Sequence, residues 1–351
     1  LASASRRRHH RGVCVWPVSR ACTTAPYDVR TQSVKTIVAH GPKELTIEER
    51  DLPVAGAGEV LIRVAAGGIC GSDLHYYNHG GFGDVRLREP MILGHEVSGR
   101  IETLGEGVRG LEVGQLVAVS PSRPCYQCQF CVEGRHNHCP NMRFYGSAMP
   151  FPHIQGAFRE FLVADQRQCA VATGLSAGEA AMAEPLSVAL HAGWRAGNLM
   201  GKSVLVTGCG PIGLLAVLAA RAAGALEIVT TDVTAFTLDM ARRIGADHAF
   251  NVAERPEALD RFAAGKGHFD VLFECSGVAQ ALTSAVSAMR PGGIIMQLGL
   301  GGDMTLPVQT ITAKELELRG SFRFHEEFFT AVDMMRSGRI DVKPLITHTL
   351  P

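Results

Sequence analysis

The stretch Val204-Leu-Val-Thr-Gly-Cys-Gly-Pro-Ile-Gly213 decides how the chain is interpreted. Its first four residues are typical of a buried strand, and the glycines that follow form a Gly-x-Gly-x-x-Gly pattern where an apolar helical segment begins. Such glycines allow a tight turn and a close approach to a pyrophosphate, which the amide groups of the helix N-terminus attract. The stretch therefore predicts a dinucleotide site built on Gly208, Gly210, Ile212 and Gly213.

An acidic residue follows at the expected distance. Asp232 ends the next predicted strand, 19 residues after Gly213. A carboxylate there accepts hydrogen bonds from the adenosine ribose and repels a 2′-phosphate, so we predict NAD, with NADP less favoured. A structural turn followed by a solvated aspartate is the alternative.

Strands and helices alternate around this stretch. Strands are predicted at 203–207, 227–231, 249–252, 271–274, 294–298 and 317–320, and helices at 212–223, 235–244, near 257 and at 279–289. This alternation predicts an α/β domain with a parallel, doubly wound sheet. Residues 34–171 instead show short alternating apolar stretches with glycine-rich turns, which predicts an all-β, barrel-like domain.

Two helices are predicted outside this alternation. One covers 176–198, with a kink or boundary at Pro185. The other covers 326–336, and its expected apolar side consists of Phe328, Phe329, Val332 and Met335 or Met334.

Composition excludes several classes of protein. The 351 residues suggest two domains, and 46% hydrophobic residues supply two cores. Lys plus Arg equals Asp plus Glu, at 34 each, so no basic surface for nucleic acid is expected. The longest apolar run, 212–220, is too short to span a membrane. We therefore expect a cytoplasmic globular protein.

The first 33 residues differ from the rest. They carry six arginines and one acid, Asp28. This composition fits a transit peptide, but helical amphipathicity is lacking, and we favour a vector-derived or mistranslated leader outside the fold.

Four of the ten cysteines fall within fifteen residues, at Cys125, Cys128, Cys131 and Cys139. Four thiolates at this spacing can close a tetrahedral zinc site that leaves no position open for chemistry. We predict a structural zinc here, and four free buried thiols are the alternative.

Further candidate ligands are scattered along the chain. Cys70, the pair His95-Glu96, and Glu184 lie on separate segments. A catalytic zinc needs about three protein ligands and one exchangeable position, so these residues qualify only if the fold brings them together. Their spacing alone does not decide between a metal site and ordinary polar contacts.

Three segments carry a resemblance to a known family: 67–77 (GGICGSDLHYY), 142–149 (MRFYGSAM) and 318–324 (LRGSFRF). With the motifs above, they show that the chain from about residue 34 resembles the zinc-dependent medium-chain dehydrogenases, which include the alcohol and sorbitol dehydrogenases. Within this superfamily it is most similar to the L-idonate 5-dehydrogenases. The resemblance implies a GroES-like catalytic domain over 34–184, completed by 322–351, and a Rossmann domain over 185–321.

The resemblance also assigns site residues. It implies that Cys70, His95, Glu96 and Glu184 hold a catalytic zinc, giving two zinc ions per chain, and that Ser72 and His75 relay a proton with Glu184 nearby. It further implies that Tyr76 and Arg323 contact substrate. The segment that it places beside the nicotinamide is Leu298, Gly299 and Leu300.

The chain departs from the family pattern at three points. Phe236 and Thr237 stand where an arginine often lies along the adenine, and Phe324 stands where sorbitol dehydrogenases have tyrosine, which disfavours sorbitol. The sequence also stops at Pro351, a few tens of residues before the family's usual end, so we expect part of the catalytic domain to be missing.

The implied reaction is hydride transfer from a secondary alcohol of a sugar acid to NAD, which converts L-idonate to 5-keto-gluconate. A sorbitol, xylitol or threonine dehydrogenase is the alternative within enzymes. A non-catalytic dinucleotide-binding protein and a zinc-sensing regulator are alternatives from other classes. We expect a sugar acid or polyol as ligand, and a homo-oligomer, either a dimer or a tetramer.

Overall fold

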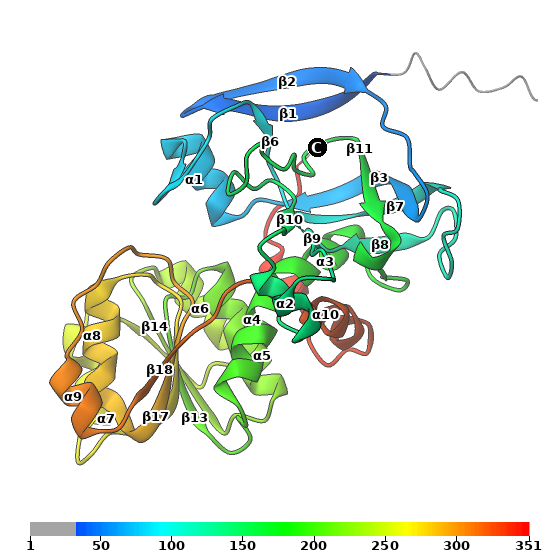
Figure 1. The fold of residues 1–351 in the computed structure, drawn as a ribbon. Helices are drawn as coiled ribbons and strands as arrows, with labels where there is room; N and C mark the ends of the chain where they lie inside the picture. The colour runs from blue at the N-terminus through cyan, green and yellow to red at the C-terminus, as the bar shows by residue number, and fades with distance from the viewer. Residues whose placement is uncertain (1–32, 351) are drawn as a thin grey trace, which may run out of the picture.

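The computed structural model describes residues 33–350, which form two lobes (Figure 1). The β-rich lobe contains strands β1 to β12, and the α/β lobe contains β13 to β18. The predicted leader lies outside the described residues, apart from Ser33, which begins β1. Among the residues described, no helix has both the length and the apolar character needed to cross a membrane.

The β-rich lobe is built on a five-stranded antiparallel sheet with the order β11-β3-β7-β8-β12. Alternate side chains of its strands, such as Val60 and Ile62 on β3, form the core of the lobe. A three-stranded sheet, β2-β1-β6, lies beside it, and two short hairpins, β4-β5 and β9-β10, complete the lobe. The strands are β1 (Ser33–Gly41), β2 (Glu44–Asp51), β3 (Glu59–Gly68), β4 (Gly81–Phe82), β5 (Val85–Arg86), β6 (Met91–Ile92), β7 (Glu96–Leu104), β8 (Leu116–Val119), β9 (Ser122–Arg123), β10 (Arg143–Phe144), β11 (Phe161–Asp165) and β12 (Cys169–Val171).

Helices in this lobe are short. They are α1 (Gly71–His79), α2 (Gln129–Val132), η2 (His136–His138), η3 (Gln166–Gln168) and α3 (Ala177–Ala181). The sequence did not predict α1 as a helix. It begins at Cys70 with a capping box in which Asp73 accepts from the Cys70 amide, and it ends at Gly80 in the left-handed conformation.

The α/β lobe confirms the predicted doubly wound sheet. Six parallel strands have the order β15-β14-β13-β16-β17-β18, and the order reverses between β13 and β16. Val204 and Val206 on β13 face one core with α4 and α5, while Leu205 faces the opposite core with α8. The strands are β13 (Ser203–Thr207), β14 (Glu227–Asp232), β15 (His248–Asn251), β16 (Phe269–Glu274), β17 (Met289–Gln297) and β18 (Glu317–Gly320).

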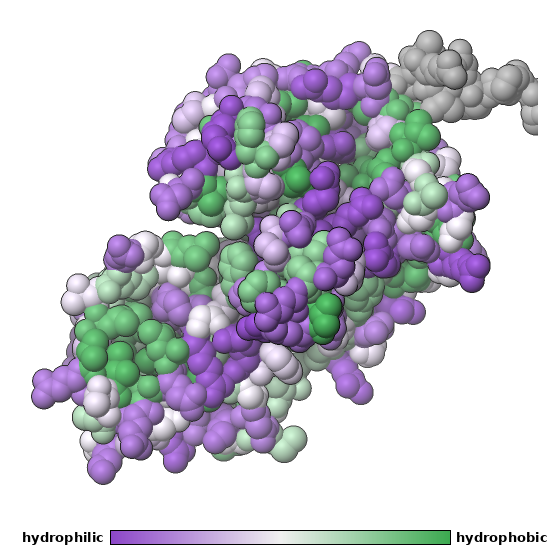
Figure 2. Space-filling model, in the orientation of Figure 1, coloured by the Kyte–Doolittle hydropathy of each residue, from purple (hydrophilic) through white to green (hydrophobic). Residues whose placement is uncertain are grey.

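Helices cover both faces of this sheet (Figure 1). They are α4 (Ala183–Ala196), α5 (Pro211–Ala222), α6 (Ala235–Arg243), η4 (Pro256–Leu259), α7 (Asp260–Ala263), α8 (Ala279–Ala288) and α9 (Val308–Ala313). Apolar side chains gather over the α8–α9 side (Figure 2), where Val278 and Val308 are exposed at the beginnings of these two helices.

The last helix, α10 (Glu327–Arg336), packs on α4 and contacts β12, so it joins the two lobes; the short η5 (Lys343–Leu345) follows it. Phe328, Val332 and Met335 are buried as predicted. Phe329 is not part of the buried side, because 40% of it is exposed. Phe324, just before the helix, is fully buried and stacks on Phe328.

The predicted helix over 176–198 is two helices, α3 and α4, that meet at Met182. Pro185 neither kinks nor ends a helix, because it lies in the first turn of α4, where no intrahelical partner for its missing N–H is needed. The predicted domain boundary at residues 184 and 185 falls in this same turn and stays a prediction.

Candidate active site

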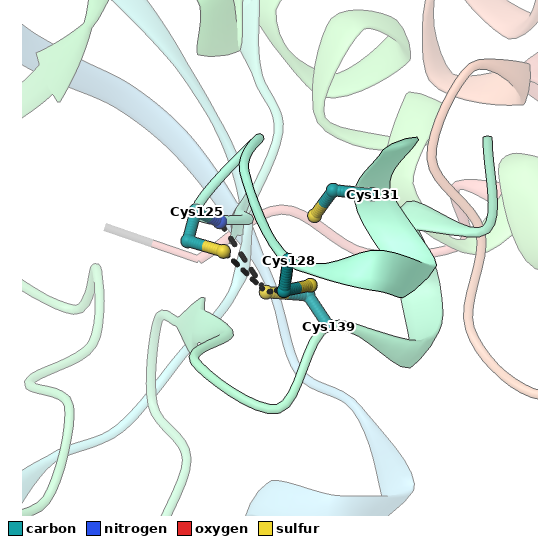
Figure 3. A group of neighbouring side chains, drawn as sticks. All are labelled: Cys125, Cys128, Cys131 and Cys139. Carbon is teal, nitrogen blue, oxygen red and sulfur yellow. Dashed lines mark hydrogen bonds between the residues drawn. The ribbon is translucent and has the colours of Figure 1, made fainter. Parts of the chain in front are cut away.

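The four clustered cysteines lie on the loop between β9 and β10, and their sulfur atoms point toward one another (Figure 3). All four Sγ atoms lie within 4.8 Å of one another. The Sγ atoms of Cys125 and Cys139 are 3.5 Å apart, and those of Cys128 and Cys139 are 3.9 Å apart. Sulfur ligands of a tetrahedral zinc stand about 3.8 Å apart, since each Zn–S bond is about 2.3 Å. The donor set and its spacing fit a zinc ion with no open position.

A second cluster forms where α1 meets β7. Cys70 is the N-cap residue of α1, Glu96 begins β7, and His95 directly precedes it. One ligand atom from each of these residues lies within 4.8 Å of the other two. The fold therefore brings together three of the four residues that were predicted to hold a catalytic zinc.

Asp73 joins the two segments that carry these ligands. Its Oδ2 accepts a hydrogen bond from the Cys70 amide at 3.0 Å, and its Oδ1 accepts one from the Gly94 amide at 3.0 Å. Asp73 is 2% exposed. Sequence reasoning missed this residue, although it lies inside the quoted motif, because its role depends on a contact 21 residues away.

His95 suits a metal ligand. Only 5% of it is exposed, its Nδ1 has no hydrogen-bond partner, and this atom lies 3.9 Å from Asp73 Oδ1. Burial lowers the pKa of His95, which favours the neutral imidazole that binds metals. A backbone turn at Gly94, with φ of 89°, precedes it, and a Cβ on Gly94 would come within 2.3 Å of the Phe158 ring.

Glu184 is near this cluster but outside the group of three. It lies in the first turn of α4 and is 5% exposed. Burial, followed by the charges of Glu96 and Asp73, raises the pKa of Glu184 well above its usual range. Burial, followed by the charges of Glu96 and Glu184, raises the pKa of Cys70 to about 12.

These shifts share one physical cause. Burial and Asp73 also raise the pKa of Glu96 to about 7. A thiol and several carboxyl groups thus crowd a buried space, and their charged forms repel one another. A divalent cation would relieve this repulsion and take the place of the protons. The chemistry of the donor set therefore fits a zinc ion, for which Cys70, His95 and Glu96 supply the closest ligands and Glu184 is an adjacent candidate.

Ser72 and His75 lie one turn apart on α1. Ser72 is half-buried beside Cys70, whereas His75 is exposed and contacts the rings of His79 and Phe82. Residues three apart share a helix face, so the pair leads from the cluster to solvent. Tyr76, on the same helix, is 2% exposed, and its hydroxyl accepts a hydrogen bond from the Ala148 amide. Its role as a substrate contact stays a prediction.

Arg323 lines a cavity of about 340 Å³ together with Met149, Phe144 and the loop after α2. Its guanidinium lies over the rings of Phe144 and Phe322, at 4.3 and 5.0 Å from their centroids. Burial lowers the pKa of Arg323 to about 10, and it still carries a positive charge at neutral pH. Among residues 33–350, no carboxylate lies within ion-pair distance of it.

Phe324 does not bear on the choice between a polyol and a sugar acid. Phe324 was expected to replace a tyrosine that binds polyols. Because Phe324 is fully buried in the core beside Phe328, the lack of a hydroxyl there does not remove a substrate contact, and it does not count against a polyol.

The glycine turn between β13 and α5 has the geometry of a dinucleotide site. Gly208 has φ of 83°, and a Cβ there would lie 2.7 Å from the Ser276 amide nitrogen. A Cβ on Gly213 would lie 1.8 Å from Gly208 O, whereas one on Gly210 would meet no atom within 4 Å. Gly210 is the N-cap residue of α5, so the open space lies where a pyrophosphate would meet the helix N-terminus.

Asp232 is at the end of β14 beside this turn. Its Oδ2 accepts a hydrogen bond from the Cys209 amide at 2.5 Å, and its Oδ1 accepts bonds from the Val233 and Thr234 amides. The carboxylate is therefore fixed next to the turn. The segment Leu298–Leu300 follows β17 at the same edge of the sheet, with Leu300 82% exposed.

Comparisons with known proteins agree with this geometry. Residues 56–174 match the alcohol dehydrogenase GroES-like domain, and residues 211–337 match the zinc-binding dehydrogenase family. The chain belongs to the zinc-binding dehydrogenases, which confirms the family and the fold class predicted from the sequence.

The chain is similar to particular idonate and sorbitol dehydrogenases. The chain is 42% identical to L-idonate 5-dehydrogenase (NAD(P)(+)) of Escherichia coli K12 over 92% of both chains. It is 37% identical to sorbitol dehydrogenase of Bos taurus over 90% of this chain and 89% of that protein. The crystal structure of the Escherichia coli L-idonate 5-dehydrogenase superposes with a TM-score of 0.85 at 40% identity, over 90% of each chain.

Proposed function

We propose that this protein oxidises the secondary alcohol of L-idonate, a sugar acid, to 5-keto-gluconate, with NAD as the hydride acceptor. The observation that carries the choice of a sugar acid is Arg323, a half-buried cation with no carboxylate within ion-pair distance among the described residues. A planar guanidinium is the best match for a substrate carboxylate. Relatives of both kinds, idonate and sorbitol dehydrogenases, support the wider class of substrate.

Two zinc ions per chain are part of this proposal. Cys125, Cys128, Cys131 and Cys139 would hold one that stabilises the loop. Cys70, His95 and Glu96 would hold the other beside the substrate, with Glu184 in reach of it or of its water. When bound, zinc lowers the pKa of the substrate hydroxyl and NAD accepts the hydride.

The remaining tasks belong to the side chains. Ser72 would accept the substrate hydroxyl proton at its Oγ while it gives up its own hydroxyl proton toward His75, which is exposed one turn further along α1 and would pass a proton to solvent. Asp73 orients His95 and holds the Cys70 segment against Gly94. Gly208, Gly210, Ile212, Gly213 and Asp232 bind the ADP portion of the cofactor, and Leu298, Gly299 and Leu300 lie beside its nicotinamide.

A polyol such as sorbitol or xylitol is the second candidate substrate, because several sorbitol dehydrogenases are 36–37% identical to this chain. The same metal and cofactor chemistry serves both classes of substrate, so only the end of the substrate far from the reacting hydroxyl distinguishes them.

We also expect the protein to be cytoplasmic and to form a dimer or tetramer, and the apolar surface over α8 and α9 supports an oligomer (Figure 2).

The test is NADH formation from L-idonate by the zinc-loaded protein, before and after dialysis against a chelator. Activity should disappear on dialysis and return with added zinc. The variant His95→Ala should lose at least about 100-fold in turnover, since it removes a metal ligand. The control His248→Ala changes an exposed histidine on β15 and should keep full activity. Activity that survives both dialysis and His95→Ala would refute the proposal.

A further inference from the structure

Glu274 is a fully buried carboxylate that none of the functional assignments above uses. It ends β16 and is 0% exposed. No lysine or arginine among the described residues pairs with it. A buried charge without a counter-ion is costly unless hydrogen-bond donors surround it, so its surroundings explain why it is tolerated.

The donors come from three strand ends. Oε1 accepts hydrogen bonds from the Ser276 amide at 2.9 Å, from the Ser276 hydroxyl, and from Thr207 Oγ1, at the end of β13, at 3.4 Å. The Gly277 amide donates to both carboxylate oxygens, at 3.1 Å each. Oε2 also accepts from Gln297 Nε2, at the end of β17, at 2.7 Å.

This network extends to the segment 298–300. Gln297 Nε2 also donates to Gly299 O at 2.9 Å, and the amides of Leu298 and Gly299 both donate to the backbone oxygen of Glu274 at 2.9 Å. Packing here is tight, because a Cβ on Gly299 would lie 2.2 Å from the Gly277 nitrogen and 2.6 Å from Glu274 Oε2. One carboxylate therefore fixes the turn after β16 and the segment after β17 against each other.

We propose that Glu274 is a positioning residue for the nicotinamide half of the cofactor, acting through Gln297 and the segment 298–300. This inference rests on the proposed binding of NAD. The turn 208–213 and Asp232, which would hold the ADP half, have their own hydrogen bonds, and they meet the Glu274 network only through the Thr207 hydroxyl and where Gly208 packs against Ser276. Loss of the carboxylate should therefore weaken the binding of one half of the cofactor more than the other.

Glu274→Gln tests the network with little change of shape. The new side-chain amide of residue 274 would place an NH2 group where its neighbours also present donors. Gln297 could accept from this NH2 group only by turning its own amide oxygen inward, and the turn would break the hydrogen bond from Gln297 Nε2 to Gly299 O. Gln297→Met is the second variant, since it removes the same link and leaves Glu274 in place. Glu227→Gln is the matched control. Glu227 begins β14 of the same sheet, whereas Glu274 ends its strand, and the Glu227 carboxylate pairs with His268.

The measurement is the affinity of the zinc-loaded full chain for NADH and for ADP-ribose, which lacks the nicotinamide, by calorimetric titration. Glu274→Gln should weaken NADH binding by about 10-fold or more and ADP-ribose binding by less than about 3-fold, and Gln297→Met should show the same selectivity. The control should leave both affinities unchanged.

If Glu274→Gln lowers the affinities for NADH and ADP-ribose equally, or lowers neither, the inference is overturned. If Glu274→Gln fails to fold, the ratio measured for Gln297→Met decides in the same way. A wild-type protein that fails to bind NADH would instead refute the proposed function itself, and the inference would fall with it.

Discussion

Asp73 and Arg323 show how much single residues contribute to this site. Asp73 is buried and bonded to the Cys70 and Gly94 amides, so it holds the segments that carry Cys70, His95 and Glu96 against each other. Arg323 lies over two aromatic rings, and no described carboxylate is within ion-pair distance of it, although the Glu184 charge acts on it from further away. In the proposed function, the first residue would organise the reacting end of the site, and the second would select the substrate.

Arg323→Met should remove the preference for a sugar acid. The change keeps the length of the side chain but deletes the cation, so a substrate carboxylate would be left without a partner in a buried space. We expect kcat/KM for L-idonate to fall by about 100-fold, equivalent to about 2.7 kcal/mol, while slow oxidation of sorbitol persists. Initial rates with both substrates check this. A variant that loses both activities in equal proportion would contradict the role of Arg323 in selectivity.

Asp232 should make NAD the preferred cofactor. Its carboxylate is fixed beside the glycine turn, and a 2′-phosphate brought against it should cost at least about 1–2 kcal/mol, or ten- to thirty-fold in affinity. Arg242 is not free to compensate, because its guanidinium is bonded to Asp239 and to Ala249 O. The measurement is kcat/KM with each cofactor at one substrate concentration, for the wild type and for Asp232→Ala. Equal efficiency with NADP in the wild type would show that Asp232 does not select the cofactor.

At the scale of elements, the loop between β9 and β10 depends on its cysteines. It holds only two short helices, of which α2 is capped by Cys128 and contains Cys131, and η2 ends just before Cys139. Cys128→Ser should therefore reduce the zinc content from two ions to one and lower solubility or thermal stability, because a structural zinc contributes folding free energy directly. His95→Ala should also lose one zinc ion but keep its melting temperature. Metal analysis and thermal unfolding of both variants test this difference between a structural and a catalytic zinc. Equal melting temperatures for Cys128→Ser and His95→Ala would contradict it.

The end of β11 should make stability depend on pH. Asp165 begins η3, and its carboxylate accepts three hydrogen bonds from Arg167, which lower the pKa of Asp165 below its usual 3.8. A lowered pKa stabilises the fold fully above the unfolded-state pKa, and this contribution is lost as the pH falls toward the folded-state pKa. Asp165→Asn should lower the free energy of unfolding by about 1–3 kcal/mol near pH 7, and the difference should shrink below about pH 4.

Urea unfolding of wild type and variant at several pH values measures this difference. The control Asp333→Asn removes an exposed carboxylate on α10, whose partner is Arg336, and should change stability by less than about 0.5 kcal/mol. A difference for Asp165→Asn that stays constant through the acid range would assign its effect to packing instead of charge.

Local patterns predicted the α/β lobe well and the helices of the β-rich lobe poorly. The strands β13 and β18 have the predicted bounds, α5 differs by one residue at each end, and α6 differs by one residue at its C-terminal end, because apolar patterns and flanking turns mark these elements directly in the sequence. The helix α1 was missed since only Asp73 and Tyr76 of its residues are buried, so it has no apolar stripe. Its start depends on a cysteine cap and a local hydrogen bond.

At the scale of the whole molecule, the two clusters of candidate metal ligands differed in how far the sequence alone could predict them. Cys125, Cys128, Cys131 and Cys139 lie close together in the sequence, and their spacing alone predicted a site that the fold brings together. The second cluster joins α1 to β7, with Glu184 arriving from α4 about 90 residues later. No local pattern contains such contacts, and only the resemblance to a family indicated them before the structure did.

The junction of the two lobes connects the metal cluster of the β-rich lobe to the dinucleotide turn of the α/β lobe. The helices α4 and α10 pack on each other and share a core with β8 and β12, so the dinucleotide turn and the metal cluster belong to one connected body. The space-filling view shows a hollow between the lobes on the side of α1 (Figure 2).

The most direct test of the whole account is the ratio of kcat/KM for L-idonate to that for sorbitol, measured as NADH formation by the wild-type, zinc-loaded protein at one pH. Because the Arg323 cation has no carboxylate within ion-pair distance and can bind a substrate carboxylate, we expect L-idonate to be oxidised at least about 100-fold more efficiently. Comparable efficiencies for the two substrates, or sorbitol as the better one, would contradict it.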